Sequence, residues 1–275
     1  MSDATAETRK IARVGALPQA PAADLRRARW AGFVGTMLEN YDMVIYSTAT
    51  ALVFNAVFFP NVDPVVGYIS SFGAYAVGFG ARPLGGLFFS RFGDRLGRRF
   101  VMVATLYLMG TATFAMGLLP TYGAVGLLAP ILLVLCRFLQ GFGAGAEMAS
   151  GVVLLTEYAR PGKRGQTAAM VWIGAACGFV LAAGVWMIIQ TLMPREAMLD
   201  WGWRVVFLSS IFVTIIAYII RRTMKESPVF AEVKADAQAQ ARTPIAEVFR
   251  HGRKPLLGAA LVNLSLGVGN FARTG

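Results

Sequence analysis

Long apolar runs alternate with short polar segments along most of this chain. A membrane-spanning α-helix needs about 20 mostly apolar residues. Six runs reach that length, at about residues 30–59, 65–90, 100–119, 125–158, 167–192 and 204–220. The pattern therefore predicts an all-α membrane protein built as a six-helix transmembrane bundle, plus part of a seventh helix.

The polar segments divide the chain into four expected parts. Residues 1–29 are basic and polar, which predicts a disordered cytoplasmic tail rather than a cleaved signal peptide. Residues 30–222 hold the predicted bundle. Residues 223–254 are polar and Ala/Gln-rich in part, as expected of a cytoplasmic linker between two bundles. Residues 255–275 read as a seventh transmembrane helix that is cut short.

Positive charge gathers at the polar turn that follows the second run. Four arginines and one acid lie within nine residues there: Arg91, Asp94, Arg95, Arg98 and Arg99. Cytoplasmic loops of membrane proteins collect Lys and Arg. Gly93 and Gly97 would allow the chain to turn sharply, so we expect a tight cytoplasmic turn beginning at the Gly-Asp-Arg sequence.

Composition and charge distribution support this topology. The chain is 56% hydrophobic and 15% charged, with a net charge of +11. Of the 26 Lys and Arg, 21 lie in the tail or in loops that would share one side of the membrane. This asymmetry predicts a cytoplasmic N-terminus and a place in the cell inner membrane, and it argues against a nucleic-acid-binding groove.

The residues offer little for catalysis or metal binding. Cys136 and Cys177 lie within apolar runs, and the single histidine, His251, lies in a basic loop without a second ligand. No phosphate-binding loop and no nucleophile–base set is evident. We therefore expect neither an enzyme nor a cofactor or metal.

Ionisable residues within the apolar runs are the main candidates for function, because such residues are costly in a membrane. Five stand out: Glu39, Asp42, Arg82, Arg137 and Glu147. Asp42 and Arg137 each lie roughly 18 Å along their helices from Trp30 and Val125, near the middle of the bilayer. An acid that alternates between pairing with an arginine and holding a proton can carry protons. The alternative is a structural ion pair that fixes two helices.

Other residues extend this candidate site. Gly141 and Gly145 make the fourth helix thin near the charges. Tyr46 and Gln140 could line a path, although such residues more often serve packing. Glu147 could either line a cavity or stabilise helix packing.

Several sequence strings resemble one known family. The turn GDRLGRR at 93–99 is similar to a loop of the major facilitator superfamily. Four longer strings resemble the metabolite:proton symporter family: GTMLENYDMVIY (35–46), SFGAYAVGFGARPLGG (71–86), RFLQGFGAGAEMASG (137–151), and WRVVFL (203–208) followed by ESPVF (226–230). This family includes permeases for proline/betaine, α-ketoglutarate, citrate and shikimate. Asn40 and Met43 stand where that family has aromatic residues.

The resemblance implies a secondary transporter, a proton-coupled symporter of a small organic acid or zwitterionic metabolite that works by alternating access. Its proton-coupling residues would be Asp42, Arg137 and Glu39. Its substrate-binding residues would be Arg82, Tyr46, Gln140 and Glu147. Cytoplasmic gating contacts would involve Asp94, Arg95, Arg98, Glu157, Arg164 and Glu226.

The family has twelve spans in two bundles, so the expected partners are protons, a small-molecule substrate, the lipid bilayer, and a missing C-terminal bundle or a second copy of this chain. The alternative from another class is a non-transporting truncated gene product, or a membrane bundle that only binds a partner. No nucleic acid is expected as a partner.

Overall fold

The computed structural model describes residues 21–159, 162–223 and 258. The chain divides into two compact units, Met1–Phe230 and Ala231–Gly275. The described part of the first unit is helical throughout, with these elements: α2 (Ala22–Ala49), the π-helical turn η1 (Thr50–Phe54), α3 (Asn55–Phe58), α4 (Pro64–Leu96), α5 (Arg98–Leu118), α6 (Tyr122–Val125), α7 (Leu128–Tyr158), α8 (Arg164–Leu192), α9 (Arg195–Ala197), the π-helical turn η2 (Met198–Gly202) and α10 (Trp203–Arg222).

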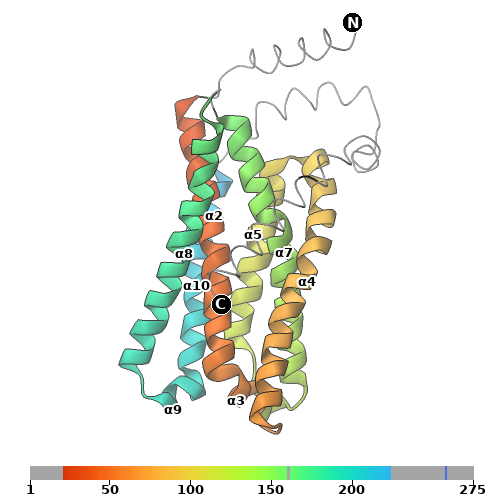
Figure 1. Cartoon of the computed structure of the whole chain (residues 1–275), viewed down its shortest axis with the longest axis vertical. Helices are drawn as coiled ribbons and strands as arrows, with labels where there is room; N and C mark the ends of the chain where they lie inside the picture. The colour runs from red at the N-terminus through yellow and green to blue at the C-terminus, as the bar shows by residue number, and fades with distance from the viewer. Residues whose placement is uncertain (1–20, 160–161, 224–257, 259–275) are drawn as a thin grey trace, which may run out of the picture. The chain divides into compact units, whose positions relative to one another are not determined.

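The long helices lie side by side as a bundle (Figure 1). Helix α2 packs against α7, α8 and α10, α7 packs against α4 and α5, and α5 packs against α10. This arrangement confirms the predicted all-α bundle. The predicted seventh helix and most of the predicted linker lie outside the described residues.

Two expected boundaries differ from the structure. The first helix begins at Ala22, so residues 22–29 of the predicted tail are helical. The sharp turn does not begin at Gly93, because α4 continues to Leu96. The chain turns instead at Gly97, whose φ of 101° and ψ of 162° place it in a region that essentially only glycine occupies.

Length and apolar composition make five of the described helical segments candidates for membrane spans: Ala22–Phe58, Arg99–Leu118, Leu128–Tyr158, Arg164–Leu192 and Arg195–Arg222. Helix α4 is long enough to span, but Arg82, Arg91 and its glycines lower its mean hydropathy. Large apolar side chains face outward on the bundle, including Ile69, Val180 and Phe212, which are 66%, 74% and 69% exposed. Such surfaces suit lipid rather than water, and the chain is a multi-pass membrane protein.

Aromatic side chains pack the end of the bundle where α2 gives way to η1 and α3. The rings of Phe54, Phe58, Trp203 and Phe207 are buried against one another. Trp186 of α8 is also buried in this cluster, and its indole Nε1 donates a hydrogen bond to the carbonyl of Ile45 at 3.2 Å. This cluster fixes the far end of α2 and so helps to set the position of its polar middle.

Glycines let two pairs of helices approach to backbone contact. A Cβ at Gly141 would overlap the backbone of Gly78, and one at Gly145 would overlap the carbonyl of Arg82, so α7 and α4 touch directly. In the same way Gly174 and Gly178 of α8 lie against the backbone of α2. Close packing through small residues is common between helices in lipid.

This packing gives a first prediction. Gly141→Ala should lower the melting temperature of the detergent-solubilised protein, because the methyl group must push α4 away at a cost of about 1–3 kcal/mol. Gly184→Ala is the matched control, because a Cβ at Gly184 meets nothing within 4 Å. Gly184→Ala should gain up to about 1 kcal/mol of helix propensity without a clash, and should therefore melt at or above the temperature of the unsubstituted protein. Equal melting temperatures for the two variants would contradict the backbone contact.

Candidate functional site

Polar side chains from three helices converge on one small cavity inside the bundle. Five residues predicted from the sequence line it: Glu39, Asp42, Arg82, Arg137 and Gln140. Its volume is about 10 Å³, close to the space that a single water molecule needs. The predicted clustering of acids and arginines is therefore present in the structure.

Helix α2 carries both acids toward the cavity. Glu39 and Asp42 are three residues apart, hence on one helix face, and each is only 2% exposed. At 1.5 Å per residue, Asp42 lies about 30 Å from Ala22 and about 24 Å from Phe58. Although the helix begins earlier than expected, Asp42 still lies near the middle of the span.

A directed chain of hydrogen bonds connects Arg137 to Asp42. Arg137 Nη1 donates to Oε1 of Gln140, and Gln140 Nε2 donates to the hydroxyl of Thr113 at 2.6 Å. The Thr113 hydroxyl donates to Oδ2 of Asp42 at 2.7 Å. The other carboxylate oxygen, Oδ1, is buried and has no hydrogen-bond partner among the described residues.

Arg137 is held by aromatic rings rather than by an acid. Its guanidinium carbon lies 3.9 Å from the ring centroid of Tyr46 and 4.5 Å from that of Tyr75. The two rings stack with centroids 5.4 Å apart. Cation–π contacts of this kind strengthen when they are desolvated. Tyr46 thus contacts Arg137 and is not among the residues that line the cavity.

The structure changes one expectation about these residues. Asp42 and Arg137 were expected to be able to pair directly, yet the described residues include no ion pair between them. The stacked rings and Gln140 occupy the guanidinium, and Thr113 lies between Gln140 and the carboxylate. Both charged groups line the same cavity, but the hydrogen bonds that connect them pass through the neutral side chains of Gln140 and Thr113.

Arg82 pairs instead with Glu39. Its Nη1 atom lies 3.1 Å from Glu39 Oε1, and its Nη2 donates to the sulfur of Met43 at 3.3 Å. The Arg82 side chain is 29% exposed whereas that of Glu39 is 2% exposed. Arg82 is therefore the more accessible cation of the site.

Glu147 lies in a second buried cluster, about 15 Å further along α7 from Arg137. Its carboxylate forms an ion pair with Arg221 of α10 and accepts a hydrogen bond from Thr105 of α5 at 2.8 Å. Arg221 is completely buried and also donates to the carbonyl of Met102. A Cβ at Gly35 of α2 would overlap this pair. A substrate contact for Glu147 stays a prediction.

Arg221 and Thr113 were not identified from the sequence. Arg221 stands at the end of an apolar run and was counted among the cytoplasmic loop cations, but it points back into the bundle. The signal that could have found it is Glu147, because a buried carboxylate needs a cation partner. A threonine in an apolar helix such as α5 carries no comparable signal.

The predicted gating residues stay predictions. Arg164 is exposed at the first residue of α8, and Glu157 is partly buried near the end of α7. The side chains of Asp94, Arg95 and Arg98 and the whole of Glu226 lie outside the described part of the chain.

The described residues form an all-helical membrane bundle with buried acids and arginines at mid-span, and comparisons with known proteins identify the class to which this bundle belongs. The family described as "Sugar (and other) transporter" matches residues 30–256, and the chain belongs to this family of the major facilitator superfamily. Solved structures of the Escherichia coli proton:xylose symporter XylE match at TM-scores of 0.70 and 0.67, with 16% and 17% identity. The matched regions cover 78% and 83% of this chain and 48% and 57% of the two XylE chains.

Curated relatives are much closer in sequence. The inner membrane metabolite transport protein YhjE of Escherichia coli is 40% identical over 233 residues, which are 84% of this chain and 53% of that protein. The shikimate transporter of Escherichia coli is 40% identical over 82% of this chain and 52% of its own. The proline/betaine transporter of Salmonella typhimurium is 38% identical over 76% of this chain and 41% of its own length. The chain spans about half the length of the curated relatives it matches.

The buried pair of Glu147 and Arg221 gives a second prediction. Arg221→Met should destabilise the protein by about 3–5 kcal/mol, because it leaves a carboxylate buried without its cation. The double variant Glu147→Leu/Arg221→Met should recover much of that loss. Unfolding by sodium dodecyl sulfate in mixed micelles measures both effects.

The control for this measurement is Arg222→Met, which removes an exposed charge from the adjacent position. It should change stability little. A similar loss for Arg221→Met and Arg222→Met would show that the ion pair does not stabilise the bundle.

Proposed function

We propose that this chain is one bundle of a proton-coupled symporter for a small organic acid or a zwitterionic metabolite. The observation that carries the proposal is the cavity at mid-span, where Glu39 and Asp42 face Arg82 and Arg137. Charges at that depth are costly and usually mark an ion or substrate pathway.

Asp42 is the proposed proton carrier. Its Oδ1 atom has no hydrogen-bond partner among the described residues, so a proton can bind there without breaking the bond from Thr113. Binding the proton removes a buried negative charge, which lowers the cost of keeping the group in apolar surroundings. The aromatic and amide contacts of Arg137 do not involve the Asp42 carboxylate, so they would persist in either state of the acid.

Arg82 is the proposed substrate contact. It is accessible and pairs with Glu39, so a substrate carboxylate can compete with Glu39 for the same guanidinium. A proton on Glu39 would weaken that pair and release Arg82 for the substrate. This exchange would couple proton binding to substrate binding, and the guanidinium geometry favours a carboxylate ligand.

The complete carrier would contain a second bundle that supplies the remaining substrate contacts and rocks against this one. Support comes from the share of the relatives that this chain covers. The printed names of those relatives include an inner membrane protein, a shikimate transporter and a proline/betaine transporter. They favour an inner-membrane location and a small polar metabolite as substrate. The distribution of Lys and Arg along the chain favours a cytoplasmic N-terminus.

A third prediction tests the coupling. In proteoliposomes that contain the complete carrier, Asp42→Asn should abolish accumulation driven by an imposed pH gradient, because asparagine cannot carry the proton. Exchange of labelled for unlabelled substrate should persist, because exchange needs no net proton movement. Asp63→Asn is the control, since Asp63 caps α4 by accepting from the Val65 amide at 2.9 Å and asparagine caps equally well. Uphill uptake by Asp42→Asn would remove Asp42 from this role.

A fourth prediction tests the substrate contact. Arg82→Gln should raise KM for a carboxylate substrate by about 10-fold or more, as expected when a charge-assisted hydrogen bond of roughly 1.5–3 kcal/mol is lost. Initial rates of uptake over a range of concentrations measure this. Arg91→Gln, on the same helix but outside the cavity, is the control. An unchanged KM for Arg82→Gln would exclude Arg82 from substrate binding.

A further inference from the structure

A second cavity lies at the end of the bundle where α2 and α8 begin, far from Glu39 and Asp42. Its volume is about 340 Å³, within the range of small-ligand sites. Six residues line it: Ala22, Leu25, Arg26, Arg29, Lys163 and Thr167. Three of these are cationic and none is acidic, so the cavity is built for an anion.

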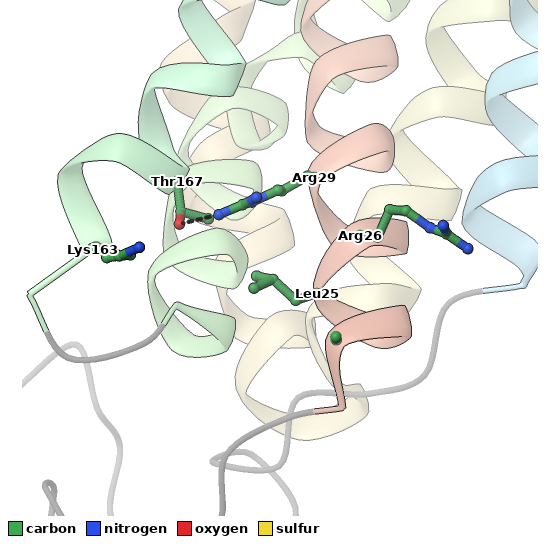
Figure 2. Close-up of a pocket in the computed structure, with 6 residues that line it drawn as sticks. Leu25, Arg26, Arg29, Lys163 and Thr167 are labelled. Atoms are coloured by element: carbon green, nitrogen blue, oxygen red, sulfur yellow. Dashed lines mark hydrogen bonds between the residues drawn. The ribbon is translucent and has the colours of Figure 1, made fainter.

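Arg29 is fixed across the cavity rather than free in solvent. Figure 2 shows its side chain extending from α2 to Thr167 of α8, whose hydroxyl accepts a hydrogen bond from Arg29 Nη2 at 3.2 Å. The Nε atom of Arg29 is also buried, but it has no hydrogen-bond partner among the described residues. The hydrogen bond to Thr167 therefore holds the Arg29 guanidinium in place at the wall of the cavity.

Lys163 and Leu25 complete the chemistry of this cavity. Lys163 lies at the start of α8 on the same side as Thr167, and Leu25 adds an apolar wall from α2 (Figure 2). Arg26 is exposed on the same turn of α2. Figure 2 shows Arg26 extending away from Thr167, which leaves Arg29 and Lys163 as the two cations beside the apolar wall. This combination suits a ligand with an anionic head and an apolar body.

Two exposed tryptophans place this cavity at the membrane surface. Trp30 follows Arg29 directly and is 51% exposed, and Trp172 of α8 is 66% exposed. Trp172 lies about 7.5 Å deeper along its helix than Thr167. Tryptophan gathers at the headgroup level of membranes. The cations of the cavity therefore lie at or just outside the lipid phosphates.

From this geometry we infer that the cavity between α2 and α8 binds the phosphate headgroup of an anionic phospholipid, held by Arg29 and Lys163 with the glycerol and acyl portion against Leu25. Basic pockets between transmembrane helices are suited to such headgroups. The inference does not depend on the proposed transport activity.

Native mass spectrometry of the detergent-solubilised chain can test this with phosphatidylglycerol as the probe and phosphatidylcholine as the neutral reference. Arg29→Gln and Lys163→Gln should each weaken phosphatidylglycerol binding about five-fold, the value of one cation near an anionic surface. Binding of phosphatidylcholine should not change. Lys163→Gln alters only an exposed side chain and so reports on the site even where Arg29→Gln disturbs folding.

Arg27→Gln is the matched control, because Arg27 is exposed on the same helix, pairs with Asp24 at 3.3 Å and does not line the cavity. It removes the same charge and should leave phosphatidylglycerol binding unchanged. Equal weakening by all three variants would mean general charge attraction and would overturn the proposal. Inorganic phosphate serves as the soluble competitor. If it displaces phosphatidylglycerol and stabilises the protein as much as phosphatidylglycerol does, the ligand is a free anion and the lipid assignment is wrong.

Discussion

A charged side chain inside a membrane must find its partners within the protein, because hydrocarbon supplies none. Most of the polar architecture here follows from that constraint. Glu39 pairs with Arg82, and Glu147 pairs with Arg221. Arg137 uses two aromatic rings and an amide, and Asp42 uses a hydroxyl. Each of these charged residues is held by at least one side chain from a different helix, so satisfying the charges also specifies which helices become neighbours.

Backbone contact between α4 and α7 is the second requirement of the polar cavity. Because Gly141 and Gly145 carry no side chains, α7 lies directly against Gly78 and Arg82 of α4. Arg82 and Arg137 thereby reach one small space from opposite helices. Larger residues at those glycines would separate the helices and open the site. The apolar packing and the chemistry of the cavity are thus two results of one helix–helix contact.

The helices and the mid-span charges could be predicted from the sequence because both depend on local patterns. Hydropathy gives the spans, and an acid or arginine within a span is conspicuous by itself. The turn at Gly97 and the burial of Arg221 could not be predicted in the same way. Gly93 and Gly97 are both glycines near a charged turn, and only the packing of α4 decides which one bends. The role of Thr113 depends on α5 facing α2 and α7, a tertiary relation that no local pattern encodes.

The aromatic clamp on Arg137 has an electrical consequence. Since Tyr46 and Tyr75 hold the guanidinium without contributing charge, the two acids and two arginines of the cavity sum to zero when both acids are ionised. One bound proton then makes the cavity +1. A monoanionic solute would return it to zero, whereas a zwitterion would leave it at +1. Moving that charge across a membrane potential of 100 mV is worth about 2.3 kcal/mol. In the proposed symporter with one proton per solute, the voltage across the membrane would therefore drive zwitterion uptake directly and leave monoanion uptake to the pH gradient.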